Sequence, residues 1–116
     1  MINPDIITKC QKIATGKTEV KSLHKNFPID VFLLNNRFYW DKFLDPNGKR
    51  VVKYKDSVSY LYFNEKINTE VELFYNKKYN SVNATVNFKD YGVILDHLSL
   101  KKLVHIIGLL NGWFIF

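Results

Sequence analysis

Aromatic and basic side chains recur together between residues 37 and 62, and they have the clearest chemical potential in the chain. Proteins that hold single-stranded nucleic acid combine cations along the phosphates with flat rings on which bases stack, each stack contributing about 1 to 3 kcal/mol. These residue types therefore predict a nucleic-acid-binding surface. The candidate binding residues are Arg37, Tyr39, Trp40, Lys42, Lys49, Arg50, Lys53, Tyr54, Lys55, Tyr60, Tyr62, Lys77 and Lys78.

A structural role for the same aromatic residues is the alternative interpretation. In a small β protein aromatic side chains fill the core, while lysines keep the outer face soluble. Both faces of the segment 57–63 are partly apolar, so one face packs inward and the other is either covered or used for stacking. If Tyr54, Tyr60 and Tyr62 face outward, this region is a binding surface; if they face inward, it is a wall of the core.

Motifs for catalysis or for a cofactor are not found in this sequence. The stretch ATGKT at 14–18 resembles the end of a phosphate-binding P-loop, but the first glycine of that motif would fall at Gln11, and the loop would follow a helix. His24, His97 and His105 lack the spacing of a metal site. We therefore expect no enzyme activity, no catalytic residue, no metal and no cofactor.

Length and composition predict a single domain, 1–116, with a polyanionic partner. The chain has 116 residues, is 47% hydrophobic, and has a formal net charge of +6. The electric field of a positively charged protein attracts phosphates.

The single Cys10 excludes an internal disulfide and is typical of a reducing compartment. The first ten residues lack the apolar run of a signal peptide, and the apolar stretch 103–116 is shorter than a membrane span requires. These features favour a cytoplasmic location without membrane contact.

Helix signals are found at both ends of the chain. Asn3 and Pro4 form a cap and a first turn, and Gly16 is suited to end an N-terminal helix. A second, amphipathic helix is predicted from the cap Ser99 to Asn111.

Strands are predicted between these helices, where β-branched and aromatic residues are bounded by Asn, Asp, Gly or Pro. Alternation is clearest in 81–88, and in 69–75 the polar face is acidic because it contains Glu70 and Glu72. The pattern predicts a β-rich α+β fold: a curled antiparallel sheet or a small OB-like barrel, with a short N-terminal helix and a C-terminal amphipathic helix. The six predicted strands are 29–34, 37–44, 50–55, 57–63, 69–75 and 81–88, with a hairpin turn at DPNGK between the second and third.

A family resemblance follows from RFYWDKF, KRVVKYK and SVSYLYF on neighbouring predicted strands. With these segments the chain resembles the small single-stranded-DNA-binding proteins of bacteriophages, particularly those of lactococcal phages. The resemblance implies an oligonucleotide-binding barrel that coats single strands during replication or recombination, forms dimers or tetramers, and works in the host cytoplasm. The sequence departs from relatives with an acidic C-terminal tail, because it ends in GWFIF.

The sequence therefore favours two alternative functions. The first is sequence-tolerant single-stranded DNA binding, with a replication or recombination protein as a further partner. The alternative is a small protein-binding inhibitor or immunity-type module that acts on an acidic partner.

Overall fold

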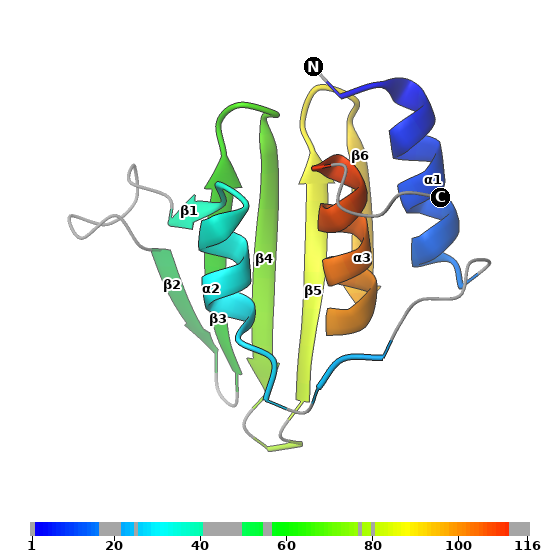
Figure 1. The fold of residues 1–116 in the computed structure, drawn as a ribbon. Coiled ribbons are helices and arrows are strands. Elements are labelled where there is room, and N and C mark those ends of the chain that lie inside the picture. The colour runs from blue at the N-terminus through cyan, green and yellow to red at the C-terminus, as the bar shows by residue number, and fades with distance from the viewer. Residues whose placement is uncertain are drawn as a thin grey trace.

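The computed structural model describes residues 2–16, 22–24, 26–40, 50–54, 57–76, 78–79 and 81–111, with backbone alone at 40, 50–54 and 57. Within these ranges the fold is α+β, as predicted: helices cover one face of an antiparallel sheet (Figure 1). The elements are α1 (Pro4–Ala14), α2 (Ile29–Asn35), β1 (Tyr39–Trp40), β2 (Arg50–Tyr54), β3 (Ser57–Asn64), β4 (Thr69–Asn76), β5 (Ser81–Phe88), β6 (Val93–Leu98) and α3 (Leu100–Leu110).

The sheet is open rather than closed into a barrel. The strand order is β1-β3-β4-β5-β6, and β2 also pairs with β3. Among the described strands, β6 therefore forms one edge, and β1 and β2 together form the other. Of the two predicted forms of the fold, the open sheet is the one observed, and the OB-like barrel is not.

The two predicted terminal helices are confirmed, together with their caps. The side chain of Asn3 accepts the backbone N–H of Asp5 at 2.8 Å, and Gly16, at φ 77°, follows the end of α1. Gly16 therefore ends a helix, which is the alternative to the P-loop interpretation. At α3, the hydroxyl of Ser99 accepts the N–H of Lys102 at 3.3 Å. Both helices are locally encoded, because cap residues satisfy the first free N–H groups.

The predicted strand at 29–34 is wrong, because this segment forms the helix α2. Its buried residues are Ile29, Phe32 and Leu33, which have the i, i+3, i+4 spacing of a helix face. In this short segment the β-branched residues Ile29 and Val31 favoured a strand. Packing of the helical apolar face onto the sheet overrides that weak local preference.

The predicted strands 50–55, 57–63, 69–75 and 81–88 correspond to β2, β3, β4 and β5. The predicted alternation is also confirmed, because Val71 and Leu73 are buried in β4 and Ala84, Val86 and Phe88 in β5. These residues form the core with the apolar faces of the helices. The acidic face of β4 lies on the side of the sheet away from the helices.

One strand, β6, was not predicted. Its register against β5 shifts between Ala84 and Val86, so that Leu95 and Leu98, three residues apart, are both buried. A β-bulge of this kind breaks the period-2 pattern on which strand prediction depends. The predicted strand 37–44 is observed only at β1, because Arg37 and Phe38 belong to the turn after α2; residues 41–44 and the DPNGK turn lie outside the described residues.

Within the described part of the chain, no helix has the length and apolar character needed to cross a bilayer.

Candidate nucleic-acid interface

Two described parts of the basic and aromatic run, β1 and β2, lie along one edge of the sheet. β1 pairs with the end of β3 through Tyr39↔Phe63, and β2 pairs with the rest of β3, from Arg50↔Leu61 to Tyr54↔Ser57. The two strands follow one another along β3, and residues 41–49 are inserted between them. We call these two strands the β1–β2 edge. Its partner β3 has eight residues, which corresponds to a length of about 27 Å.

Tyr62 points into the core and is not available for stacking. Its side chain is 1% exposed, and its hydroxyl donates a hydrogen bond of 2.7 Å to Oδ1 of Asp30 in α2. Val71, its cross-strand partner on β4, is also buried. Because the helices cover this side of the sheet, Tyr62 fits the alternative interpretation as a core residue, and we leave it out of the interface.

Tyr60 lies on the same covered side of β3, but it is only partly buried. Its ring packs edge-to-face against Tyr75, with 5.5 Å between the ring centres and 89° between the planes. Burial raises the pKa of Tyr75 to about 12, and the charges of Asp30 and Tyr60 contribute to that rise. Tyr60 therefore belongs to the rim of the core rather than to an open stacking surface.

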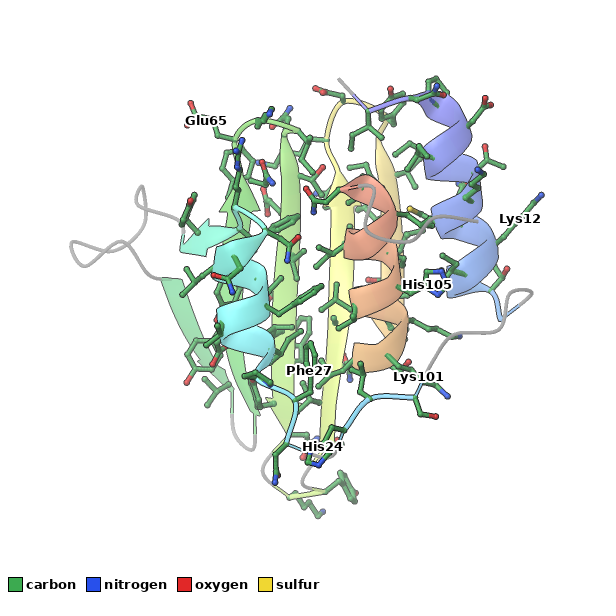
Figure 2. The ribbon with its side chains drawn as sticks, viewed as in Figure 1. Lys12, His24, Phe27, Glu65, Lys101 and His105 are labelled. Atoms are coloured by element: carbon green, nitrogen blue, oxygen red, sulfur yellow. The ribbon has the colours of Figure 1, made fainter. Side chains whose placement is uncertain are left out.

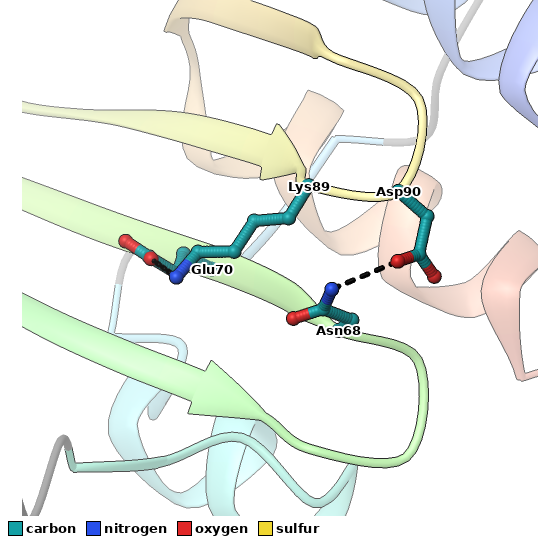
Figure 3. Close-up of polar contacts among 4 residues, drawn as sticks. All are labelled: Asn68, Glu70, Lys89 and Asp90. Carbon is teal, nitrogen blue, oxygen red and sulfur yellow. Dashed lines mark hydrogen bonds and ion pairs between the residues drawn. The ribbon is translucent and has the colours of Figure 1, made fainter.

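Tyr39 does offer an open ring. Its side chain is 52% exposed, and its pairing with Phe63 places both residues on the face away from the helices. The ammonium group of Lys89 lies 5.1 Å from the centre of the Phe63 ring and forms an ion pair with Glu70 (Figure 3). Arg37, just before β1, is exposed. Sequence patterns did not single out Phe63 or Lys89, which are brought together only by strand pairing.

The acidic residues of the helix-free face are engaged by neighbouring groups. Glu70 pairs with Lys89, and a carboxylate oxygen of Glu72 accepts a hydrogen bond from the hydroxyl of Ser59. Beside them, Asn68 donates to Asp90 at 2.8 Å (Figure 3). These contacts reduce, but do not remove, the negative potential over β4, so a polyanion would be favoured at the β1–β2 edge rather than over the middle of the sheet.

A second open ring lies at the opposite end of the sheet from Tyr39. Tyr79, in the turn between β4 and β5, is 70% exposed, and the ammonium group of Lys78 lies 5.4 Å from its ring centre. Tyr54 at the end of β2 pairs with Ser57, and Ser57 pairs with Asn76 at the end of β4, so this turn lies at the same end of the sheet as the end of β2, with β3 and β4 between them. Tyr79 was missed from the sequence, although its position directly after two lysines in NKKYN was a usable signal.

The other predicted binding residues are described only in part. The backbone of Trp40, Arg50, Lys53 and Tyr54 lies in β1 and β2. The remaining predicted residues, Lys42, Lys49, Lys55 and Lys77, lie outside the described residues.

A polar cavity of about 390 Å³ lies beside the start of β1. It is formed where the C-terminal ends of α2 and α3 meet the turn after β3. We call it the Asn cavity, after the residues that dominate its wall. Its lining residues are Asn35, Asn36, Arg37, Asn64, Lys66, Ile67, Leu110 and Asn111.

Three of these asparagines form a hydrogen-bonded network behind the cavity. Asn36 and Asn64 are each 3% exposed, and Nδ2 of Asn64 donates to the backbone carbonyl of Asn36 at 3.1 Å. Nδ2 of Asn111 donates to Oδ1 of Asn36 at 2.9 Å. Oδ1 of Asn64 accepts the N–H of Ile67 at 3.3 Å. The network joins three elements that are far apart in sequence and holds the cavity wall in place.

Other reactive residues do not gather into a site. Within the described ranges, no group of three or more His, Cys, Asp or Glu side chains could hold a metal ion. Cys10 is fully buried, and burial raises the pKa of its thiol to about 12, so it has little thiolate character at neutral pH. His105 is buried in α3.

Comparison with known proteins finds no family model that matches the chain, and neither a curated protein nor a solved structure that is significantly similar to it.

Proposed function

We propose that this protein binds single-stranded DNA with little sequence preference, in phage-type DNA replication or recombination, and without catalysis. One observation carries the proposal: Arg37 and Tyr39 are exposed at one end of the β1–β2 edge, Lys78 and Tyr79 are exposed in the β4–β5 turn at the end of the sheet where β2 finishes, and between them Arg50–Tyr54 pair with β3. An edge about 27 Å long suits an extended polymer. Stacking on the open rings would supply affinity without reading sequence.

The test is the binding of a fluorescein-labelled 30-nucleotide oligo-dT, measured by anisotropy at several salt concentrations. We expect affinity to fall with salt, with a slope of about 0.7 log units per neutralised phosphate. Tyr79→Ala removes an exposed ring and should weaken binding by about fivefold or more at an unchanged melting temperature. The absence of binding at low salt would refute the proposal.

A matched pair of lysine substitutions tests where the strand lies. Lys78→Gln and Lys12→Gln remove the same charge from exposed side chains, but Lys12 projects from α1 on the opposite side of the molecule from β1 (Figure 2). We expect Lys78→Gln alone to weaken binding and to lower the salt slope. Equal effects of the two substitutions would mean that net charge, rather than the position of the lysine, determines affinity.

Self-association into a dimer or tetramer, in the host cytoplasm, belongs to the same proposal. Among the described strands β6 is the edge opposite β1 and β2, and its Ile94 is exposed. An unpaired strand edge can pair with another copy of the chain. Light scattering coupled to size exclusion should then give a mass above 13.7 kDa, and a monomer at all concentrations would contradict this part of the proposal.

A second function, the binding of a protein partner as an inhibitor or immunity-type module, is favoured by one observation. Val31 and Leu34 are exposed apolar residues on the outer side of α2. Exposed apolar side chains at helical spacing suit a protein contact. If a nuclease-treated pull-down returns one stoichiometric protein and this contact is lost in Leu34→Lys, the second function replaces the first.

A further inference from the structure

The Asn cavity has the chemistry of an anion site. Arg37 and Lys66 are exposed at its wall, and no Asp or Glu is among its lining residues. Glu65, next to Lys66 in the chain, points outward (Figure 2). Neither cation takes part in an ion pair with another described residue. A planar guanidinium beside an ammonium group suits the oxygens of a phosphate.

The position of Arg37 is costly for its residue type. Arg37 has φ 66°, in the left-handed region that glycine or asparagine ordinarily occupies after a helix. Its N–H donates to the carbonyl of Leu34 at 3.1 Å, and the N–H of Phe38 donates to that of Leu33 at 2.9 Å, which closes a Schellman motif at the end of α2. An arginine is not needed to end this helix, so its presence at a strained position favours a role for its side chain.

The remaining lining groups suit a nucleobase. Asn111 uses Nδ2 for its bonds to Asn36 and to the carbonyl of Ile107, so its Oδ1 can accept from a ligand, and the amide of Asn35 is exposed. Amide side chains pair well with base edges. Ile67 and Leu110 add apolar surface for a ring face. The volume of about 390 Å³ falls in the range of small-molecule sites.

From these observations we propose that the Asn cavity binds the phosphomonoester of a nucleotide, with Arg37 and Lys66 on the phosphate and the amides of Asn35 and Asn111 on the base. The nucleotide is either a free nucleoside monophosphate or the phosphorylated end of a DNA strand. Only the strand-end form rests on the proposed function, because Tyr39 lies two residues after Arg37 and its open ring would receive the next base.

Four probes distinguish the two sources: thymidine monophosphate, thymidine, and 12-nucleotide oligo-dT with either a 5′-phosphate or a 5′-hydroxyl. Calorimetry with the full chain measures each affinity. The variants are Arg37→Gln and Lys66→Gln, with Lys12→Gln as a control of equal charge and exposure. Melting temperatures establish that each variant is folded.

If the free nucleotide is the ligand, thymidine monophosphate binds, thymidine does not, and both cavity variants bind it about tenfold more weakly. If the strand end is the ligand, the 5′-phosphate raises oligo-dT affinity at least fivefold, and Lys66→Gln removes this increase while leaving the 5′-hydroxyl strand bound as before.

The inference is overturned if neither phosphate has an effect, or if Lys12→Gln matches the cavity variants. Its failure is separate from that of the proposed function. Oligo-dT that binds with no preference for a phosphate refutes the cavity site alone. Binding of thymidine monophosphate without binding of oligo-dT refutes the proposed function alone.

Discussion

Replacing Arg37 with glycine should stabilise the fold while weakening the binding of a phosphate. Arg37 is the residue after the cap of α2 and has φ 66°. An L-amino acid in this left-handed conformation costs about 1 to 2 kcal/mol. Glycine removes that cost, but it also raises the conformational entropy of the unfolded chain, which lowers the free energy of unfolding by about 0.4 to 1 kcal/mol. Because the Arg37 side chain is exposed, its removal sacrifices little packing.

The difference between these terms is a gain of about 0.8 kcal/mol in the free energy of unfolding. In a chain of 116 residues this corresponds to a rise of about 3 °C in melting temperature. Urea denaturation should show a higher midpoint with an unchanged slope, since neither the folded nor the unfolded surface changes much.

Arg37→Ala is the matched control, because alanine removes the guanidinium but keeps the β-carbon that causes the strain. We expect Arg37→Ala to unfold at the same urea concentration as the parent chain, while both variants lose phosphate affinity equally. If Arg37→Gly is no more stable than Arg37→Ala, residue 37 is not strained in the folded state. Backbone strain would then no longer support a binding role for the Arg37 side chain.

Three further predictions concern the core. Tyr62→Phe should lower the free energy of unfolding by about 1 kcal/mol, because the hydrogen bond to Asp30 is lost, and should leave oligo-dT affinity unchanged. Weaker DNA binding by this variant would show that Tyr62 belongs to the interface. Asn64→Ala removes the hydrogen bonds to the carbonyl of Asn36 and from the N–H of Ile67, so it should lower the free energy of unfolding in urea by about 2 kcal/mol. A neutral effect would show that the network does not stabilise the fold. Cys10, with its pKa raised to about 12 from 9.0, should react with iodoacetamide at pH 8 only in urea. Above pH 9 the thiol ionises in the unfolded chain but not in the folded one, so the free energy of unfolding should fall as pH rises toward 12, by up to about 1.4 kcal/mol per pH unit. This part of the pH dependence should be absent in Cys10→Ala.

The elements that could be predicted from the sequence are those encoded by neighbouring residues. Asn3 and Ser99 mark helix starts because their side chains bond N–H groups two or three positions ahead. The strand β5 was predicted because its apolar residues alternate. In contrast, α2 is a short apolar segment whose pattern fits both the period of a helix and that of a strand. In β6 a bulge interrupts the alternation of apolar and polar residues.

The candidate site was predicted in part for the same reason. Composition identified a basic and aromatic run, but it could not separate Tyr39, which is open, from Tyr62, which is buried. The Asn cavity was not predictable, because Asn36, Asn64 and Asn111 come from three separate elements and each is an ordinary helix-end or strand-end residue in sequence.

The sequence by itself determined the caps of the terminal helices, the alternation of the central strands, the α+β class and the positive charge, since these depend on residues close together in the chain or on composition alone. Only the tertiary structure decided which side of the sheet the helices cover. That choice buried Tyr62 under α2, left Tyr39 open, and brought Arg37 and Lys66 together at one cavity. The physical reason is that the facing of a strand is set by what packs against it, and this contact is made by segments distant in the chain.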